Sequence, residues 1–135
     1  AALAKVRLDP KALSALKDFL AIHVGLDRAP AALSAFAIRS GLALDAALAA
    51  FGARAEAIRR EGLDPRTIRY DAAFGRPLDY YTGLVFEISA PGADKPLAGG
   101  GRYDRLLTLL GAPSPIPGVG FSVWLDRLEQ AGARQ

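Results

Sequence analysis

The sequence lacks cysteine and methionine entirely, and its 135 residues include one histidine and one tryptophan. Without cysteine the chain can form no disulfide and no thiolate metal site, and it has no cysteine nucleophile. A single histidine removes most histidine-based metal sites and every mechanism that needs a second histidine. We therefore expect no metal centre, and the arginines, tyrosines and glycines become the residues of interest.

Long apolar runs are also absent, since none approaches the roughly 18–20 residues that a membrane-spanning helix needs. The start of the chain lacks the basic segment and apolar block of a secretory signal. These absences predict a cytoplasmic protein that is not bound to a membrane. The formal charge of +3 is too small to argue for nucleic acid binding by itself. With 51% hydrophobic residues, the chain should bury the core of one ordinary domain.

The first part of the chain, residues 1–64, is rich in alanine and predicts helices. Asp9, followed by a proline, is typical of a helix start, and Gly25 is a plausible end for that helix. The apolar spacing predicts two further helices over about residues 28–39 and 44–60. His23 would then lie near the end of the first helix, where we expect a structural or exposed role.

The remainder, residues 65–135, changes to β-branched and aromatic residues with short turns between them. Strands joined by short turns favour an antiparallel sheet, so the chain as a whole is expected to have an α+β fold. The expected elements are strands over residues 67–71, 83–89, 96–99 and 118–123, and helices over residues 102–110 and 124–131.

Two stretches in this second part carry residues suited to ligand binding: RPLDYYTGLVFE, residues 76–87, and AGGGRYD, residues 98–104. Arginine presents a planar fork of donors that matches a carboxylate or phosphate. Tyrosine offers an apolar ring with a hydroxyl at its tip, and glycine lets the backbone come close to a ligand. Together they predict a pocket for a small zwitterionic or aromatic-sized ligand.

These two stretches resemble the histidine-specific motifs of histidyl-tRNA synthetase, and GVGFSVWLDRL, residues 118–128, is similar to the third class II synthetase motif. The three motifs follow in the family's order and cover about residues 66–130. The resemblance implies the C-terminal part of a class II synthetase-like antiparallel sheet flanked by helices. The first two class II motifs are not found, which implies the C-terminal half of a longer protein.

The resemblance also implies a histidine pocket. Arg76 would hold the carboxylate of the ligand, and Tyr81 and Tyr103 would surround the imidazole. Alternatively, Arg76 is a surface arginine, the tyrosines belong to the core of the sheet, and the triple glycine marks a bend. Tyr80 would point to the opposite face of an extended strand, into the core. The predicted histidine-binding set is Arg76, Tyr81, Gly99, Gly100, Gly101, Arg102 and Tyr103.

Two branches of this family share the motifs: the synthetase, and the non-catalytic regulatory subunit of ATP phosphoribosyltransferase. Trp124 stands where the synthetase usually carries a small residue near its adenine site, and Pro77 replaces a glycine. The chain also ends a few residues after the third motif. These departures favour the regulatory branch, with Trp124 and Arg127 as a vestigial ATP site. Arg127 could instead pair with Asp126 or Glu129, or be solvated.

The regulatory branch implies no catalytic residue and no cofactor. It implies the short-form catalytic subunit as partner, histidine as effector, and a homo-oligomer or some self-association. The alternative is the catalytic core of a histidyl-tRNA synthetase, which would need ATP to bind beside Trp124. A free-standing RNA-binding module is the third reading, although a solvated helix face is the usual explanation of such a basic group. That group consists of Arg54, Arg59, Arg60, Arg66 and Arg69.

Overall fold

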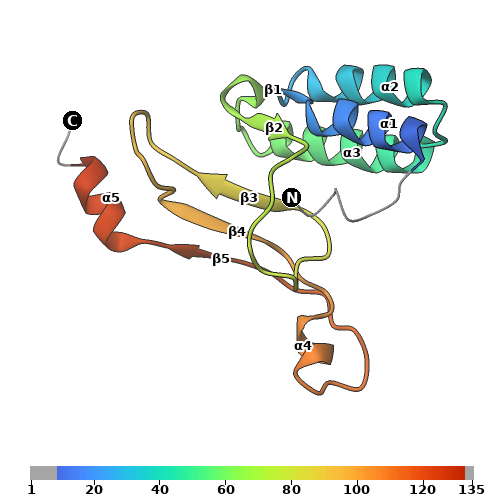
Figure 1. Ribbon diagram of the computed structural model, residues 1–135. Coiled ribbons are helices and arrows are strands. Elements are labelled where there is room, and N and C mark those ends of the chain that lie inside the picture. Colours follow the sequence, from blue (N-terminus) through green and yellow to red (C-terminus); the bar gives the residue numbers. More distant parts are fainter. Residues whose placement is uncertain (1–8, 133–135) are drawn as a thin grey trace. The chain divides into compact units, whose positions relative to one another are not determined.

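The computed structural model describes residues 9–132, and the chain divides into two compact units, Ala1–Phe74 and Gly75–Gln135 (Figure 1). The sequence predicts the change from helices to sheet at residue 64, before the boundary between these two units. Among the described residues, three α-helices and a two-stranded sheet belong to the first unit, and a three-stranded sheet with two α-helices belongs to the second.

The first unit contains α1 (Pro10–Leu20), α2 (Ala29–Ser40) and α3 (Asp45–Arg60), which lie side by side (Figure 1). The Asp9 side chain accepts a hydrogen bond from the backbone amide of Ala12, as expected for a helix cap. Gly41 ends α2 in the left-handed conformation, with φ of 67°, which glycine adopts without a steric penalty. The second and third predicted helices are confirmed, and the side chains of Leu33, Phe36 and Ala37 supply the buried face of α2.

The first helix ends at Leu20, so its predicted extension to Gly25 was wrong. The next residues form strand β1 (His23–Gly25), which pairs antiparallel with β2 (Arg69–Asp71). Val24 favours a strand because its side chain is β-branched, and the pairing satisfies backbone groups that the helix would otherwise satisfy. His23 therefore lies opposite Asp71 in a sheet and not at a helix end.

Strand β2 also begins later than predicted, because Pro65–Thr67 forms a short 3-10 turn, η2. The Asp64 carboxylate caps this turn by accepting from the backbone amide of Arg66 at 2.9 Å.

The second unit has strands β3 (Val85–Ile88), β4 (Ala98–Arg102) and β5 (Val119–Val123) in the order β3-β4-β5, all antiparallel. The predicted antiparallel sheet flanked by helices is confirmed. However, β4 continues through the triple glycine to Arg102, whereas the predicted strand ends at residue 99. Helix α4 (Leu106–Leu109) is much shorter than the predicted helix over residues 102–110, and α5 (Leu125–Gly132) follows β5 (Figure 1).

The register of this sheet separates its two faces. Glu87 lies opposite Gly99, and Gly101 lies opposite Gly120, so these residues share one face. Apart from Arg102, the far face is apolar, and much of it is open within the described chain. Its large exposed apolar side chains are those of Ile88, Val119, Phe121 and Val123. None of the helices in residues 9–132 is long and apolar enough to cross a membrane.

Candidate functional site

The candidate site lies on the glycine-rich face of the β3-β4-β5 sheet. Four glycines on β4, on β5 and just before β5 leave room there for larger side chains from the neighbouring loops. This glycine floor consists of Gly99, Gly101, Gly118 and Gly120. A side chain at any of these positions would collide with an arginine or a tyrosine that lies against the floor. The floor is therefore a steric requirement of the site and not only a bend in a strand.

Arg76 lies against Gly99, where a Cβ atom would come within 3.0 Å of the Arg76 Cζ atom. Arg76 Nη1 donates to Glu87 Oε1 at 3.1 Å, and 12% of the Arg76 side chain is exposed. The Nε atom of Arg76 is buried and has no hydrogen-bond acceptor within the part of the chain that the structure describes. A guanidinium fixed in this way, with unused donors, is suited to bind an anion.

The tyrosines lie along the same floor. A Cβ atom at Gly101 would come within 2.8 Å of the Tyr81 ring, and one at Gly118 within 2.9 Å of the Tyr103 ring. The centroids of these two rings are 6.4 Å apart. Both predicted imidazole-binding tyrosines therefore stand on the face that carries Arg76.

Tyr80 belongs to the same aromatic cluster, so its predicted place on the opposite face was wrong. Its ring centroid lies 4.5 Å from that of Tyr81 and 5.7 Å from that of Tyr103. Tyr80 precedes β3 in a turn, where the alternation of a strand does not apply. Its hydroxyl donates to the Tyr81 hydroxyl at 3.4 Å, and this hydrogen bond raises the pKa of Tyr80.

Two members of the predicted histidine-binding set lie elsewhere. A Cβ atom at Gly100 would point at Phe121, on the far face of the sheet. Arg102 pairs in register with Val119, also on that face, and its Nε atom donates to both carboxylate oxygens of Asp104, at 3.0 and 2.8 Å. This interaction lowers the pKa of Asp104. The structure thus gathers five of the seven predicted residues: Arg76, Tyr81, Gly99, Gly101 and Tyr103.

Trp124 adjoins the site and lies near two guanidinium groups. The Cζ atom of Arg127 lies 4.4 Å from the centroid of the Trp124 ring, and that of Arg76 lies 5.6 Å from it. Cations over an indole face are attracted by its negative quadrupole. Arg127 also donates from Nη1 to the carbonyl oxygen of Pro96 at 2.8 Å, and within the described part of the chain it forms no ion pair with Asp126 or Glu129.

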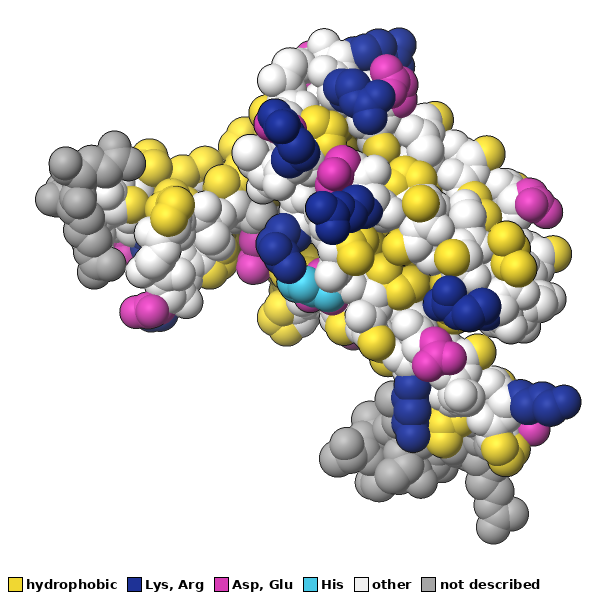
Figure 2. Space-filling model, turned by 90° about the horizontal axis from the view of Figure 1, so that it is seen from above, with side chains coloured by type: hydrophobic (Ala, Val, Ile, Leu, Met, Phe, Trp, Pro, Cys, Tyr) yellow, Lys and Arg dark blue, Asp and Glu magenta, His cyan; other side chains and the backbone are white. Residues whose placement is uncertain are grey.

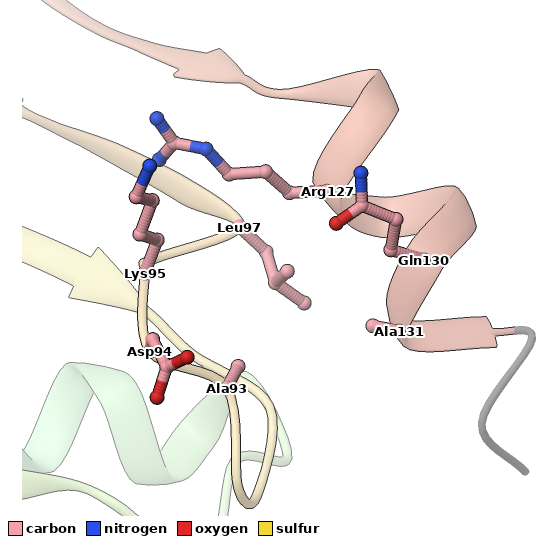
Figure 3. A pocket seen from close by; sticks show the side chains of 7 residues that line it. All are labelled: Ala93, Asp94, Lys95, Leu97, Arg127, Gln130 and Ala131. Atoms are coloured by element: carbon pink, nitrogen blue, oxygen red, sulfur yellow. The ribbon is translucent and has the colours of Figure 1, made fainter.

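A separate cavity of about 260 Å³ opens beside Arg127, between the β3–β4 turn and α5 (Figure 3). In this view the polar ends of Lys95 and Arg127 lie toward one end of the cavity, while Leu97 and Ala131 supply apolar walls. Neither Arg76 nor a tyrosine lines it. Within residues 9–132 no group of three or more acidic or histidine side chains could hold a metal ion.

His23 and the basic group belong to the first unit. Asp71 Oδ2 lies 3.1 Å from His23 Nδ1, and Arg69 Nε donates to His23 Nε2 at 3.0 Å. The hydrogen bond from the backbone amide of Ala73, together with His23, lowers the pKa of Asp71. Arg59 and Arg66 are paired with Glu56 and Asp64. On the face drawn in Figure 2 the basic side chains are interspersed with acidic and apolar ones.

Sequence reasoning missed four parts of the site: Tyr80, Glu87, Gly118 and Gly120. Glu87 ends the first motif, but the resemblance implies no role for it. The sequence does carry a signal for Glu87. Glu87 and Val85 are two residues apart on β3, and side chains two residues apart on a strand face the same side. Gly118, just before β5, and Gly120, on β5, are likewise two residues apart, which predicts that both lie on one face. What the sequence could not supply was the register that sets Glu87 opposite Gly99.

Comparison with known proteins identifies the family to which the chain belongs. The family model for histidyl-tRNA synthetase matches residues 1–128. The chain is 68% identical over 129 residues to an ATP phosphoribosyltransferase regulatory subunit from Mesorhizobium japonicum, covering 96% of this chain and 35% of that protein. It is 64% identical over 128 residues to a protein of the same name from a Chelativorans species, covering 95% of this chain and 34% of that protein. The chain thus spans about a third of the length of these curated relatives.

Two solved structures are also similar. One is described as an ATP phosphoribosyltransferase regulatory subunit/histidyl-tRNA synthetase from Bacillus halodurans, with a TM-score of 0.74 and 28% identity, covering 96% of this chain and 33% of that chain. The other is a histidine–tRNA ligase subunit from Alicyclobacillus acidocaldarius, with a TM-score of 0.60 and 41% identity, covering 72% of this chain and 28% of that chain. The family match over nearly the whole chain, together with this shared fold, shows that the chain belongs to the histidyl-tRNA synthetase family.

Proposed function

We propose that this chain is part of a regulatory subunit of ATP phosphoribosyltransferase, a cytoplasmic, non-catalytic protein of histidine biosynthesis. It would bind histidine and act on the short-form catalytic subunit. The observation that carries the proposal is the 68% identity with a protein named as such a regulatory subunit. The solved histidine–tRNA ligase subunit is less similar, at 41%.

The site chemistry supports histidine as the ligand. Arg76 would hold the carboxylate, while Tyr81 and Tyr103 would contact the imidazole ring with their own rings and hydroxyls. Arg76 lies against Gly99 and Tyr81 against Gly101, two residues further along β4. Two residues of an antiparallel strand span about 6.8 Å, a separation that an amino acid with a single-ring side chain can bridge.

A regulatory role requires more than tight binding. Histidine must bind one state of the complex with the catalytic subunit better than the other, because equal affinity for both states shifts nothing. Trp124 supports this role over synthesis of an adenylate. Its ring lies close to both Arg76 and Arg127 and takes up space beside the two groups that would otherwise contact a nucleotide.

Calorimetric titration of the full-length gene product tests the proposal. Histidine should bind, and Arg76→Ala should weaken it by about 10- to 150-fold, the loss of one hydrogen bond to a charged group. Unchanged affinity in both Arg76→Ala and Tyr103→Ala would reject the site. Formation of histidyl-adenylate from ATP, magnesium and histidine would favour the synthetase alternative, and binding that falls steeply with salt would favour an RNA-binding module.

Assembly with other chains is part of the same proposal. Val119 and Phe121 on the far face of the sheet are 74% and 69% exposed. Exposed apolar strands at a sheet edge favour association with further polypeptide. We expect the full-length protein to form a homo-oligomer and to co-purify with the catalytic subunit. Light scattering after gel filtration would test both, and a monomer that does not bind the catalytic subunit would contradict them.

A further inference from the structure

Glu87 is the least explained group beside the candidate site. It is the acidic partner of Arg76, and its position opposite Gly99 sets it on the glycine floor. A Cβ atom at Gly99 would come within 3.2 Å of the Glu87 Cγ atom, so the missing side chain makes room for Glu87 as well as for Arg76. The pair uses one carboxylate oxygen, Oε1, and no donor among residues 9–132 reaches Oε2. The Glu87 side chain is 32% exposed and therefore accessible to a ligand.

The juxtaposition has a consequence for ligand charge. An arginine alone attracts any carboxylate. An arginine whose charge is balanced by a neighbouring glutamate attracts a simple carboxylate less, because the ligand must approach a second negative charge. An α-amino acid carries its ammonium group on the carbon next to its carboxylate. It can therefore place one charge against Arg76 and the opposite charge against Glu87, which lie 3.1 Å apart.

We infer that Glu87 determines the specificity of the site for zwitterionic α-amino acids, by accepting a hydrogen bond from the ligand ammonium through Oε2 while Oε1 stays on Arg76. This inference rests on the proposed function, because it takes histidine as the ligand. It assigns to Glu87 both an attraction for the ammonium group and a repulsion against carboxylates that lack one.

The test compares histidine with 3-(imidazol-4-yl)propionate, which differs only by the missing ammonium group. Both are titrated calorimetrically into the full-length wild-type protein and into Glu87→Gln, which keeps the shape of the side chain and an acceptor for Arg76. The wild type should prefer histidine by at least about tenfold, as expected for one hydrogen bond between charged groups. In Glu87→Gln that preference should fall by about tenfold or more, because histidine weakens and the propionate does not.

The control is Glu61→Gln, which makes the same change of charge at the end of α3, in the other unit of the chain. It should leave both affinities unchanged. Equal weakening of both ligands by Glu87→Gln would overturn the inference, because it would mean that Glu87 only holds Arg76. A wild type that binds both ligands equally would also overturn it. A wild type that binds neither would reject the proposed histidine site itself, and the inference with it.

Discussion

The substitution Gly99→Ala isolates the contribution of the glycine floor to binding. The added methyl group would lie 3.0 Å from Arg76 Cζ and 3.2 Å from Glu87 Cγ, and its closest neighbour is Arg76 Nη1. That atom is the far end of a flexible side chain, so we expect the guanidinium to move and the strand to stay. The displaced Arg76 would lose its place against Glu87 and against the ligand carboxylate.

The magnitude follows from the interaction that is lost. A hydrogen bond to a charged group contributes about 1.5–3 kcal/mol, which corresponds to an affinity for histidine about 10- to 150-fold lower. The free energy of unfolding should change by less than about 1 kcal/mol. Loss of a partly exposed ion pair costs up to about 1 kcal/mol, and replacing glycine reduces the entropy of the unfolded chain by about 0.4–1 kcal/mol.

Calorimetry with histidine and urea unfolding followed by circular dichroism measure the two quantities in the full-length protein. Gly100→Ala, one position along β4, is the matched comparison. Its methyl group would meet the backbone oxygen of Gly120 and the Cβ atom of Phe121, so it should lower stability by about 1–3 kcal/mol. Histidine affinity within twofold of wild type in a folded Gly99→Ala protein would refute the reasoning.

Two further predictions concern the first unit. Gly52→Ala, inside α3 with no atom within 4 Å of the new methyl group, should raise the free energy of unfolding by about 0.5–1 kcal/mol in urea titration, and a decrease would contradict the helix assignment. The lowered pKa of Asp71 means that its stabilising contribution is present above the unfolded value of 3.8 and is lost as the pH falls through the folded value. The stability difference between wild type and Asp71→Asn should therefore shrink below about pH 4 in denaturant titrations, and a constant difference down to pH 2 would contradict this account.

Local patterns predicted the parts of this fold that depend on local interactions. The starts and ends of α2 and α3 follow from apolar spacing and from glycines such as Gly41, and these were correct. The strand at His23 depends instead on partners 46 to 48 residues away, Arg69 and Asp71, and no local pattern contains that information. The leucines after residue 105 did suggest a helix, but pairing of Arg102 with Val119 extended β4 into the predicted range.

In the candidate site, too, local patterns predicted some features, and the pairing of distant strands determined the others. The motifs named Arg76, Tyr81 and Tyr103, and the structure gathers them against the glycine floor. Tyr80 was misplaced because strand alternation was applied to a turn, where successive side chains do not point to opposite faces. Arg102 was included because it follows the triple glycine in the motif, although it stands on the other face of the sheet. Motif membership identified the region of the site, and strand register decided which of its residues face it.

The glycine floor has a consequence for how this site can diversify. Every substitution of a glycine adds atoms, and at Gly99, Gly101, Gly118 and Gly120 the added atoms would enter space that an arginine or tyrosine already occupies. Single mutations in the floor can therefore damage the site but cannot reshape it by small steps. New ligand preferences, whether evolved or engineered, must come through the side chains that stand on the floor. A mutagenesis library directed at Tyr80, Tyr81, Glu87 and Tyr103, with the four glycines held fixed, would sample that accessible variation.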